Sequence, residues 1–232
     1  NTVTSAPTSG ATFTVDNTSP TAEISYSSDA PYKNGETVTI TATFNEAVLD
    51  SPIPTIAISG DGIANVASTN MTKQSTTVYT YSYAVPTGDG TGTVTVGTGT
   101  DAAGNIVTST PTSGATFTVD NTAPTAEITY SGAGGSPYKQ SDEVTITATF
   151  TEALVTTPKI AISGVSSIAA TNMTSTASAT VWTYAYVAPA GNGTETIALS
   201  VGTDASGNTV TSAPTSGATF TVDNTSPTAE IS

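Results

Sequence analysis

The chain repeats itself with a period of a little over 100 residues. Residues 1–25 are identical to residues 208–232, and residues 105–128 differ from the same segment at only three positions. The chain therefore holds two full periods and the start of a third. A period of this length corresponds to a whole globular domain, because the units of a solenoid span about 20–50 residues.

Each period contains about seven runs that alternate apolar and polar residues as a β-strand does. The clearest is Thr37–Phe44, in which threonines alternate with Val38, Ile40, Ala42 and Phe44. Turn residues separate the runs, and no segment has the period of a helix. Seven short strands in about 100 residues predict an all-β fold, in which immunoglobulin-like β-sandwiches follow one another in an elongated tandem array. The seven runs of the first period are Thr21–Tyr26, Thr37–Phe44, Thr55–Ser59, Val66–Met71, Thr77–Val85, Gly92–Thr98 and Thr112–Asp120.

The repeat also predicts where the domains begin and end. Residues 18–121 and 122–224 are expected to be two immunoglobulin-like repeats, preceded by the last strand of another repeat (1–17) and followed by the first strand of a further one (225–232). A last strand without its domain would expose Phe13. The ends are therefore expected either to continue into a longer array or to exchange strands with neighbouring copies.

The composition excludes several classes of function. The chain has no histidine and no cysteine, which removes imidazole and thiol catalysis and the usual zinc, haem and iron–sulfur ligands. A net charge of −14 with four basic residues argues against a nucleic-acid partner or an anionic membrane surface. No apolar run is long enough to cross a bilayer. We therefore expect a protein that is not an enzyme, does not insert into membranes and works outside the cell.

Three motifs recur in the same order in both periods. They are Val-Asp-Asn-Thr-x-Pro-Thr (15–21 and 119–125), Val-Thr-Ile-Thr-Ala-Thr-Phe-x-Glu-Ala (38–47 and 144–153) and Thr-Asp-Ala-x-Gly-Asn (100–105 and 203–208). Together they resemble the bacterial immunoglobulin-like tandem repeats of giant surface adhesins and related extracellular repeat proteins, over essentially the whole chain. The resemblance implies secreted, cell-surface extender modules stiffened by calcium. Related arrays also occur in biofilm matrix and filament-forming proteins.

Oxygen-bearing side chains are predicted to converge at one end of each repeat. In an immunoglobulin-like sandwich the second-to-third and sixth-to-seventh connections lie at the end where the chain enters. These connections carry Glu46, Asp101 and Asn105, and the entering linker carries Asp16 and Asn17. Hard oxygen ligands without nitrogen or sulfur suit Ca²⁺, so we predict a calcium site at each junction. The equivalent residues of the second repeat are Asp120, Asn121, Glu152, Asp204 and Asn208.

The same residues also have a structural interpretation that needs no metal. Asp101 and Asn105 can form an Asx turn, and Asp16, which precedes Asn17, can belong to an ordinary polar linker. Glu23 falls near the same end and could join the site. Four other acidic residues are expected at the opposite end, mainly for solvation, although Asp89 could contact the next repeat. These four are Asp29, Glu36, Asp89 and Asp142.

Tyrosines alternate along the fifth run of the first repeat. Tyr79, Tyr81 and Tyr83 could form an aromatic platform for a ligand, and the equivalent positions hold Trp182, Tyr184 and Tyr186. Alternation on one face of a strand favours packing in the core. A carbohydrate- or protein-binding module is therefore a weaker interpretation than a structural one.

Two functions follow from these patterns. The first is a non-enzymatic structural extender segment of a secreted, cell-surface repeat adhesin, whose junctions are stiffened by calcium. The alternative is a subunit of an extracellular filament or biofilm matrix fibre that assembles through its overhanging end strands. The expected partners are neighbouring repeats of the same chain in the first case and identical subunits in the second.

Overall fold

The alternating runs of both repeats form antiparallel strands. The computed structural model describes residues 13–132 and 134–231, which contain no helix, and therefore none that could span a membrane. The chain divides into two units, Asn1–Asp120 and Asn121–Ser232. Of the predicted flanking strands, residues 1–12 lie outside the described part, while residues 13–17 and 225–231 are in no strand, so both predictions remain predictions.

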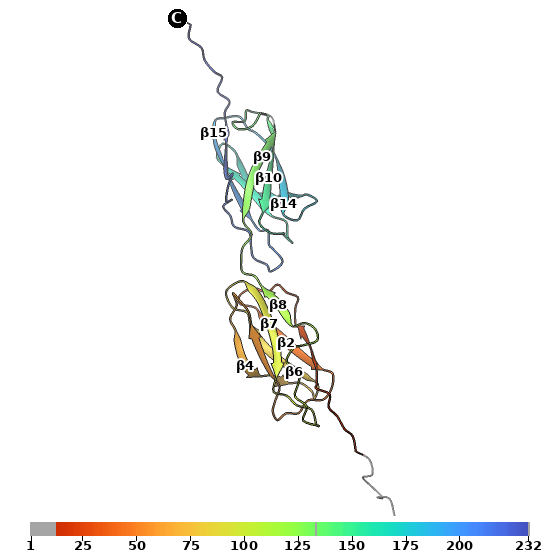
Figure 1. Ribbon diagram of the computed structural model, residues 1–232. Coiled ribbons are helices and arrows are strands. Elements are labelled where there is room, and N and C mark those ends of the chain that lie inside the picture. The colour runs from red at the N-terminus through yellow and green to blue at the C-terminus, as the bar shows by residue number, and fades with distance from the viewer. Residues whose placement is uncertain (1–12, 133, 232) are drawn as a thin grey trace, which may run out of the picture. The chain divides into compact units, whose positions relative to one another are not determined.

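The first unit consists of two four-stranded sheets, visible as the red-to-green half of Figure 1. Their strand orders are β1-β2-β6-β5 and β4-β3-β7-β8, with every pair antiparallel. This order matches the two sheets of an immunoglobulin-like sandwich with one strand added to the second sheet. The strands are β1 (Ala22–Tyr26), β2 (Thr37–Phe44), β3 (Thr55–Ser59), β4 (Val66–Asn70), β5 (Thr72–Lys73), β6 (Val78–Ala84), β7 (Gly90–Gly97) and β8 (Thr116–Val119).

The second unit repeats this topology in the orders β13-β14-β10-β9 and β12-β11-β15-β16. The predicted all-β, immunoglobulin-like fold is thus confirmed for each unit. One strand was not predicted: β5 and its equivalent β13 have two residues each, both exposed, and so leave no hydrophobic pattern. The strands are β9 (Ala126–Gly132), β10 (Glu143–Phe150), β11 (Lys159–Ser163), β12 (Ser167–Asn172), β13 (Thr174–Ser175), β14 (Val181–Val187), β15 (Gly193–Ser200) and β16 (Thr219–Val222).

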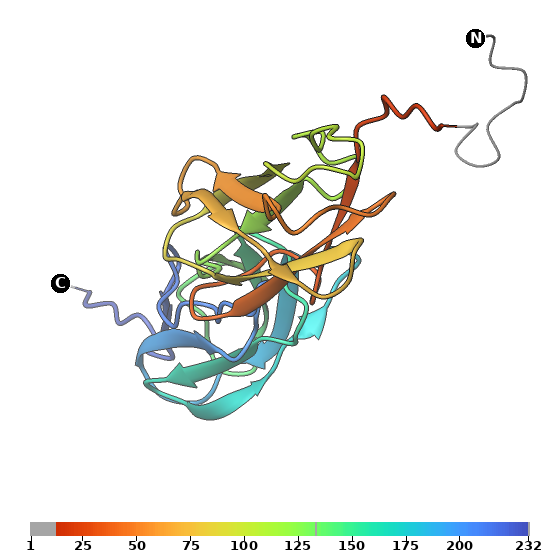
Figure 2. The ribbon, with the colours of Figure 1, turned by 90° about the horizontal axis from the view of Figure 1, so that it is seen from below.

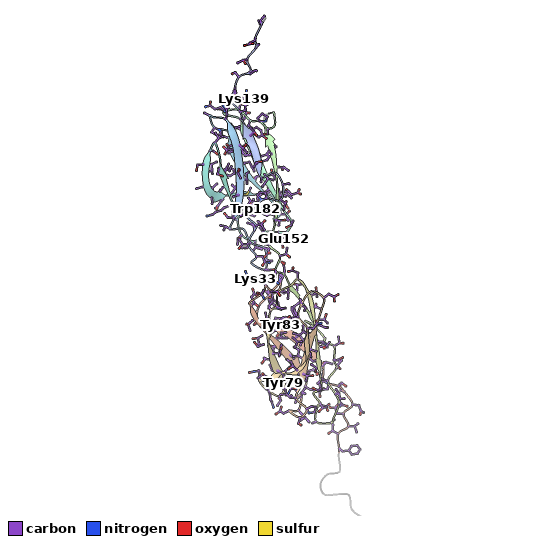
Figure 3. All side chains as sticks on the ribbon, turned by 90° about the vertical axis from the view of Figure 1, so that its left-hand side faces the viewer. Lys33, Tyr79, Tyr83, Lys139, Glu152 and Trp182 are labelled. Atoms are coloured by element: carbon purple, nitrogen blue, oxygen red, sulfur yellow. The ribbon has the colours of Figure 1, made fainter. Side chains whose placement is uncertain are left out.

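The core of each unit lies between its two sheets. Every second residue of β2 is buried there, and the intervening threonines face outward. The tyrosines of β6 follow the same rule: Tyr79 and Tyr83 are buried, and their hydroxyls donate to the carbonyls of Val48 and Ala64. Figure 3 shows Tyr79 and Tyr83 inside the first unit. The prediction that these two side chains pack in the core is therefore confirmed, and they do not form an aromatic platform for a ligand.

The last strand of each unit supplies a buried edge to that core. Phe220 and Val222 of β16 are 4% and 0% exposed. The identical residues in the segment that precedes the first unit, Phe13 and Val15, are 88% and 68% exposed. In Figure 2 this segment, coloured red, leads away from the strands of the first unit without joining a sheet. The same sequence thus occurs in one buried and one open setting.

A glycine before the last strand lets two backbones approach closely. Gly114 has φ 69°, and a Cβ there would lie 2.0 Å from the carbonyl oxygen of Ile24. The second unit reproduces the arrangement at Gly217, where a Cβ would lie 2.0 Å from the carbonyl oxygen of Ile128. Only glycine combines this φ with this contact.

We expect Gly114→Ala to destabilise the first unit by about 2–4 kcal/mol, because a left-handed backbone and a steric clash add together. Gly35→Ala is the matched control, since Gly35 has φ 89° with nothing near its absent Cβ. It should cost about 1 kcal/mol. Denaturant unfolding of the first unit measures both. Equal losses for the two variants would contradict the close-approach argument.

One charged residue lies in the core of the second unit. Glu195 on β15 is fully buried, where the first unit has Gly92. Its Oε1 accepts hydrogen bonds from the Tyr186 hydroxyl (2.7 Å) and the Ser166 backbone N–H (2.8 Å). Its Oε2 has no hydrogen-bond partner in the described protein. Burying a carboxyl group with one oxygen unpaired is costly.

Glu195→Gln should therefore stabilise the second unit by about 1–3 kcal/mol, because the amide keeps one accepting oxygen and cannot carry a charge in the core. Glu143→Gln makes the same chemical change at an exposed position of β10 and should leave stability unchanged. Calorimetry that resolves the transition of the second unit provides the measurement. A lower midpoint for Glu195→Gln would mean that the carboxylate is favourable as it stands.

Candidate metal-binding sites

The linker and two loops meet at the entering end of the first unit. Thr21, just before β1, exchanges two hydrogen bonds with Asn45 in the β2–β3 connection, at 2.8 and 3.0 Å. In the same connection, the Leu49 N–H donates to the carbonyl of Thr100 in the β7–β8 connection (2.7 Å). These hydrogen bonds fix the three segments that the sequence predicted to converge.

Three carboxylates from these segments form a cluster. Asp16 of the linker, Glu46 of the β2–β3 connection and Asp101 of the β7–β8 connection each contribute one carboxylate oxygen, and these oxygens lie within 4.8 Å of one another. Asp101 is buried, Glu46 is half-buried and Asp16 is exposed. We call these residues the acidic cluster. Among the described residues the cluster does not include Glu23, which lies on β1.

Asp101 is held by a hydrogen-bonded turn. Its Oδ1 accepts from the backbone N–H groups of Ala103 and Asn105, both at 2.8 Å, and its Oδ2 accepts from Asn105 Nδ2 at 2.7 Å. Asn105 Nδ2 also donates to the Asp16 carbonyl (3.1 Å), which ties the loop to the linker. The predicted Asx turn is therefore present, and it directs Asp101 toward the other carboxylates. Turn and metal site are thus compatible at this position.

The cluster leaves negative charge uncompensated. Burial, followed by the charges of Asp16 and Asp101, raises the pKa of the Glu46 carboxyl above its usual value. For Asp101 burial acts in the same direction, but the hydrogen bonds from Asn105, Ala103 and Gly104 outweigh it and lower its pKa. Asp50 provides the contrast, because the ammonium group of Lys73 lies 2.7 Å away and lowers its pKa. The negative charges of Asp16 and Asp101 therefore destabilise ionised Glu46, and a bound cation would remove this repulsion.

The second unit contains the same loop residues. The carboxylates of Glu152 and Asp204 approach within 4.8 Å, with Glu152 half-buried and Asp204 buried. Asn208 repeats the turn, with its N–H and Nδ2 donating to Asp204 at 2.9 and 3.0 Å. Figure 3 shows Glu152 at the end of this unit opposite Lys139. Asp120, the equivalent of Asp16, is the last residue of the first unit, so its place in this site rests on the sequence repeat.

Two predicted ligands are not explained by these contacts. Asn17 is exposed beside the first cluster, and Asn121 is half-buried at the start of the second unit. Their role as metal ligands remains a prediction.

Glu195 and the linker residue Asn224 were not singled out from the sequence as site residues. Recurrence of Asp-Asn-Thr at 16–18, 120–122 and 223–225 was the signal for Asn224, whereas nothing in the pattern distinguished a buried glutamate on β15.

The donor set fits a hard divalent cation. Three carboxylates can supply three to six oxygens, and Ca²⁺ takes 6–8 oxygens including backbone carbonyls and water. Mg²⁺ requires a tighter octahedron and releases its water reluctantly, so an open, partly exposed cluster suits Ca²⁺ better. Zn²⁺, Cu²⁺ and Ni²⁺ would prefer nitrogen or sulfur ligands, and the chain has no histidine or cysteine.

Comparison with known proteins adds little to this description. No family model and no curated protein matches the chain. Among solved structures, the human OSCAR ligand-binding domain aligns with 88% of this chain and 97% of its own length, at 9% identity and a TM-score of 0.36. The immunoglobulin-like assignment therefore rests on the strand order of each unit.

The raised pKa of Glu46 predicts how stability depends on pH without metal. A carboxyl whose pKa is higher in the folded state binds protons more readily there, so its ionisation lowers stability as pH rises through the interval above its usual value. In chelator, Glu46→Gln should therefore unfold at a higher temperature than the parent at neutral pH. The difference should shrink as pH falls and Glu46 becomes protonated.

The comparison between variants cancels the other titrating groups. Asp101, whose pKa is lowered, loses its own stabilising contribution only at more acid pH, in parent and variant alike. Asp29→Asn makes the same change of carboxylate to amide at an exposed position in the β1–β2 connection and serves as the control. If the thermal unfolding midpoint of Glu46→Gln at neutral pH were equal to or below that of the parent, ionised Glu46 would not be destabilised by the neighbouring carboxylates.

Proposed function

We propose that this chain is a non-enzymatic extender segment of a secreted, cell-surface repeat adhesin, and that calcium stiffens the junctions between its repeats. The observation that carries the proposal is the acidic cluster of Asp16, Glu46 and Asp101. A linker residue and two loop residues of one repeat meet there. A cation bound to all three would tie the linker to the repeat that follows it.

The sequence repeat extends this arrangement along the chain. Asp120 stands in the same motif as Asp16, and the second repeat supplies Glu152 and Asp204. The same three acidic residues thus recur in the sequence once per repeat, as a series of junction sites would require. Asn105 and Asn208 would contribute by orienting the buried aspartate of each site. Each bound ion would remove the mutual repulsion of the carboxylates and restrict the linker.

The rest of the surface supports a mechanical role. Threonine side chains line the outer faces of strands such as β2 and β10, and the net charge is −14. Such faces are hydrophilic and offer no apolar patch for association, and the net charge opposes lateral association of neighbouring molecules. The partners of each repeat would be its neighbours in the chain. The absence of histidine and cysteine supports the view that no catalysis takes place here.

Calcium titration tests the proposal directly. Calorimetry of the parent should show one binding event per acidic cluster, and thermal unfolding should shift upward from chelator to calcium. At a calcium concentration of one hundred times Kd, the stabilisation is about 2.7 kcal/mol per site, or roughly 10–20 °C for a domain of about 100 residues. Small-angle scattering should show a narrower range of particle dimensions in calcium.

Two isosteric variants assign the sites. Glu46→Gln should remove one binding event and the stabilisation of the first unit, and Glu152→Gln should do the same for the second. Asp29→Asn should bind as the parent does. No heat of binding and no shift of either transition in calcium would sink the metal assignment and leave Asp101 and Asp204 as turn residues.

A filament or matrix subunit is the second candidate, favoured by one observation. Phe13 and Val15 are exposed, although the same residues of β16, Phe220 and Val222, are buried in a sandwich. A strand sequence that lies outside a sheet can pair with another molecule by strand exchange. Growth into fibres that depends on protein concentration, and is lost in Phe13→Asp, would place this function first.

A further inference from the structure

The chain leaves the second unit through a well-defined set of hydrogen bonds. β16 ends at the fully buried Val222, and the Asp223 N–H donates to the carbonyl of Tyr138 (2.8 Å). Asp223 Oδ1 then accepts the N–H of Thr225 (2.8 Å). The main chain is therefore guided for several residues beyond the last strand, at the end of the unit opposite Glu152.

Asn224 makes the central contacts of this exit. Its Oδ1 accepts the backbone N–H of Gln140, and its Nδ2 donates to the carbonyl of Gly191 and, at 3.4 Å, to that of Pro189. Its own N–H donates to Oδ1 of Asn192. The β9–β10 and β14–β15 connections thus both grip one residue. We call this set, Gln140, Pro189, Gly191 and Asn192, the linker clamp.

The clamp is specific for an asparagine side chain. Oδ1 faces an N–H group and Nδ2 faces carbonyl oxygens, so the amide has one donor end and one acceptor end in fixed places. An aspartate would set a carboxylate oxygen against the Gly191 carbonyl. Alanine would leave all three side-chain contacts unmade. A shallow groove of about 440 Å³ beside the clamp is lined by Lys139, Gln140 and residues 223–227.

We propose that the exit end of each repeat is a recognition surface for the Asp-Asn-Thr segment of its own linker, and that the asparagine is the positioning residue. Asn121 follows β8 in the same sequence as Asn224 follows β16. The positions of the first repeat equivalent to Gln140, Pro189, Gly191 and Asn192 hold Asn34, Pro86, Gly88 and Asp89. Asn121 is then an anchor to the preceding repeat, which differs from its predicted role as a metal ligand.

The clamp has a consequence for the aspartate beside it. The side chain of Asp223 remains exposed, while its backbone and the next residue are fixed. An aspartate held in this way is preorganised to bind a cation next to the linker. The sequence repeat suggests that Asp120 is held in the same way, which would suit the role as a calcium ligand that the proposed function gives it, a step that rests on the proposed function.

The anchoring itself can be tested without metal. The chain has no cysteine, so Thr228→Cys provides a single attachment point for a nitroxide probe, four residues beyond Asn224. In chelator, adding Asn224→Ala should shorten the rotational correlation time of the probe roughly twofold, because the clamp no longer restrains the segment. Asn172→Ala, an exposed asparagine of β12, is the matched control and should change nothing. An unchanged spectrum in Asn224→Ala would overturn the proposal.

A second experiment distinguishes an anchor from a ligand at Asn121. If Asn121 is an anchor, both Asn121→Ala and Asn121→Asp should weaken calcium binding at the Glu152 site about fivefold, with the number of sites unchanged. If Asn121 is a ligand, Asn121→Asp should bind calcium as well as the parent or better, because it adds a carboxylate. That result would overturn the anchoring role at this linker. If calcium does not bind at all, the proposed function fails, whereas the nitroxide experiment still tests the clamp.

Discussion

The burial of the last strand is the constraint on which the rest of each unit depends. Phe220 and Val222 fill the core from β16, and Tyr138 pairs with Val222 beyond the regular sheet. The position of the next residue is therefore set by the core. The Asp-Asn pair follows the last strand immediately, without a flexible spacer. The position of the strand in the sandwich therefore fixes where the linker begins. Each unit defines the direction in which its chain leaves.

The entering end is organised by a different interaction. There the loops that carry Glu46 and Asp101 are joined by backbone hydrogen bonds, and the linker is bound through Asp16. The exit end of the second unit therefore holds the following residues through neutral amide contacts, whereas the entering end of the first unit gathers negative charge. The first kind of contact is insensitive to ions and the second is not.

Much of the fold could be predicted from the sequence. The alternation in Thr37–Phe44 and the internal repeat were sufficient for the sandwich, because each apolar residue has one face to bury. The convergence of Asp16, Glu46 and Asp101 also followed, since strand order decides which connections share an end. The recurring Asp-Asn-Thr motif marks the position of Asn224 but not its contacts, and nothing in the sequence marks Glu195. Their contacts depend on where backbone N–H and carbonyl groups point, which no residue pattern records.

Glu195 has a consequence for a chain built from nearly identical neighbours. Such neighbours can exchange strands while folding, since one repeat can complete another. In the first unit the place of Glu195 is taken by Gly92, where a Cβ would lie 2.4 Å from the ring of Phe117. A hybrid that took β15 into that core would force a carboxylate into the ring. A side chain at this position of the first core would therefore require the ring of Phe117 to move, which disfavours such an exchange relative to the native pairing.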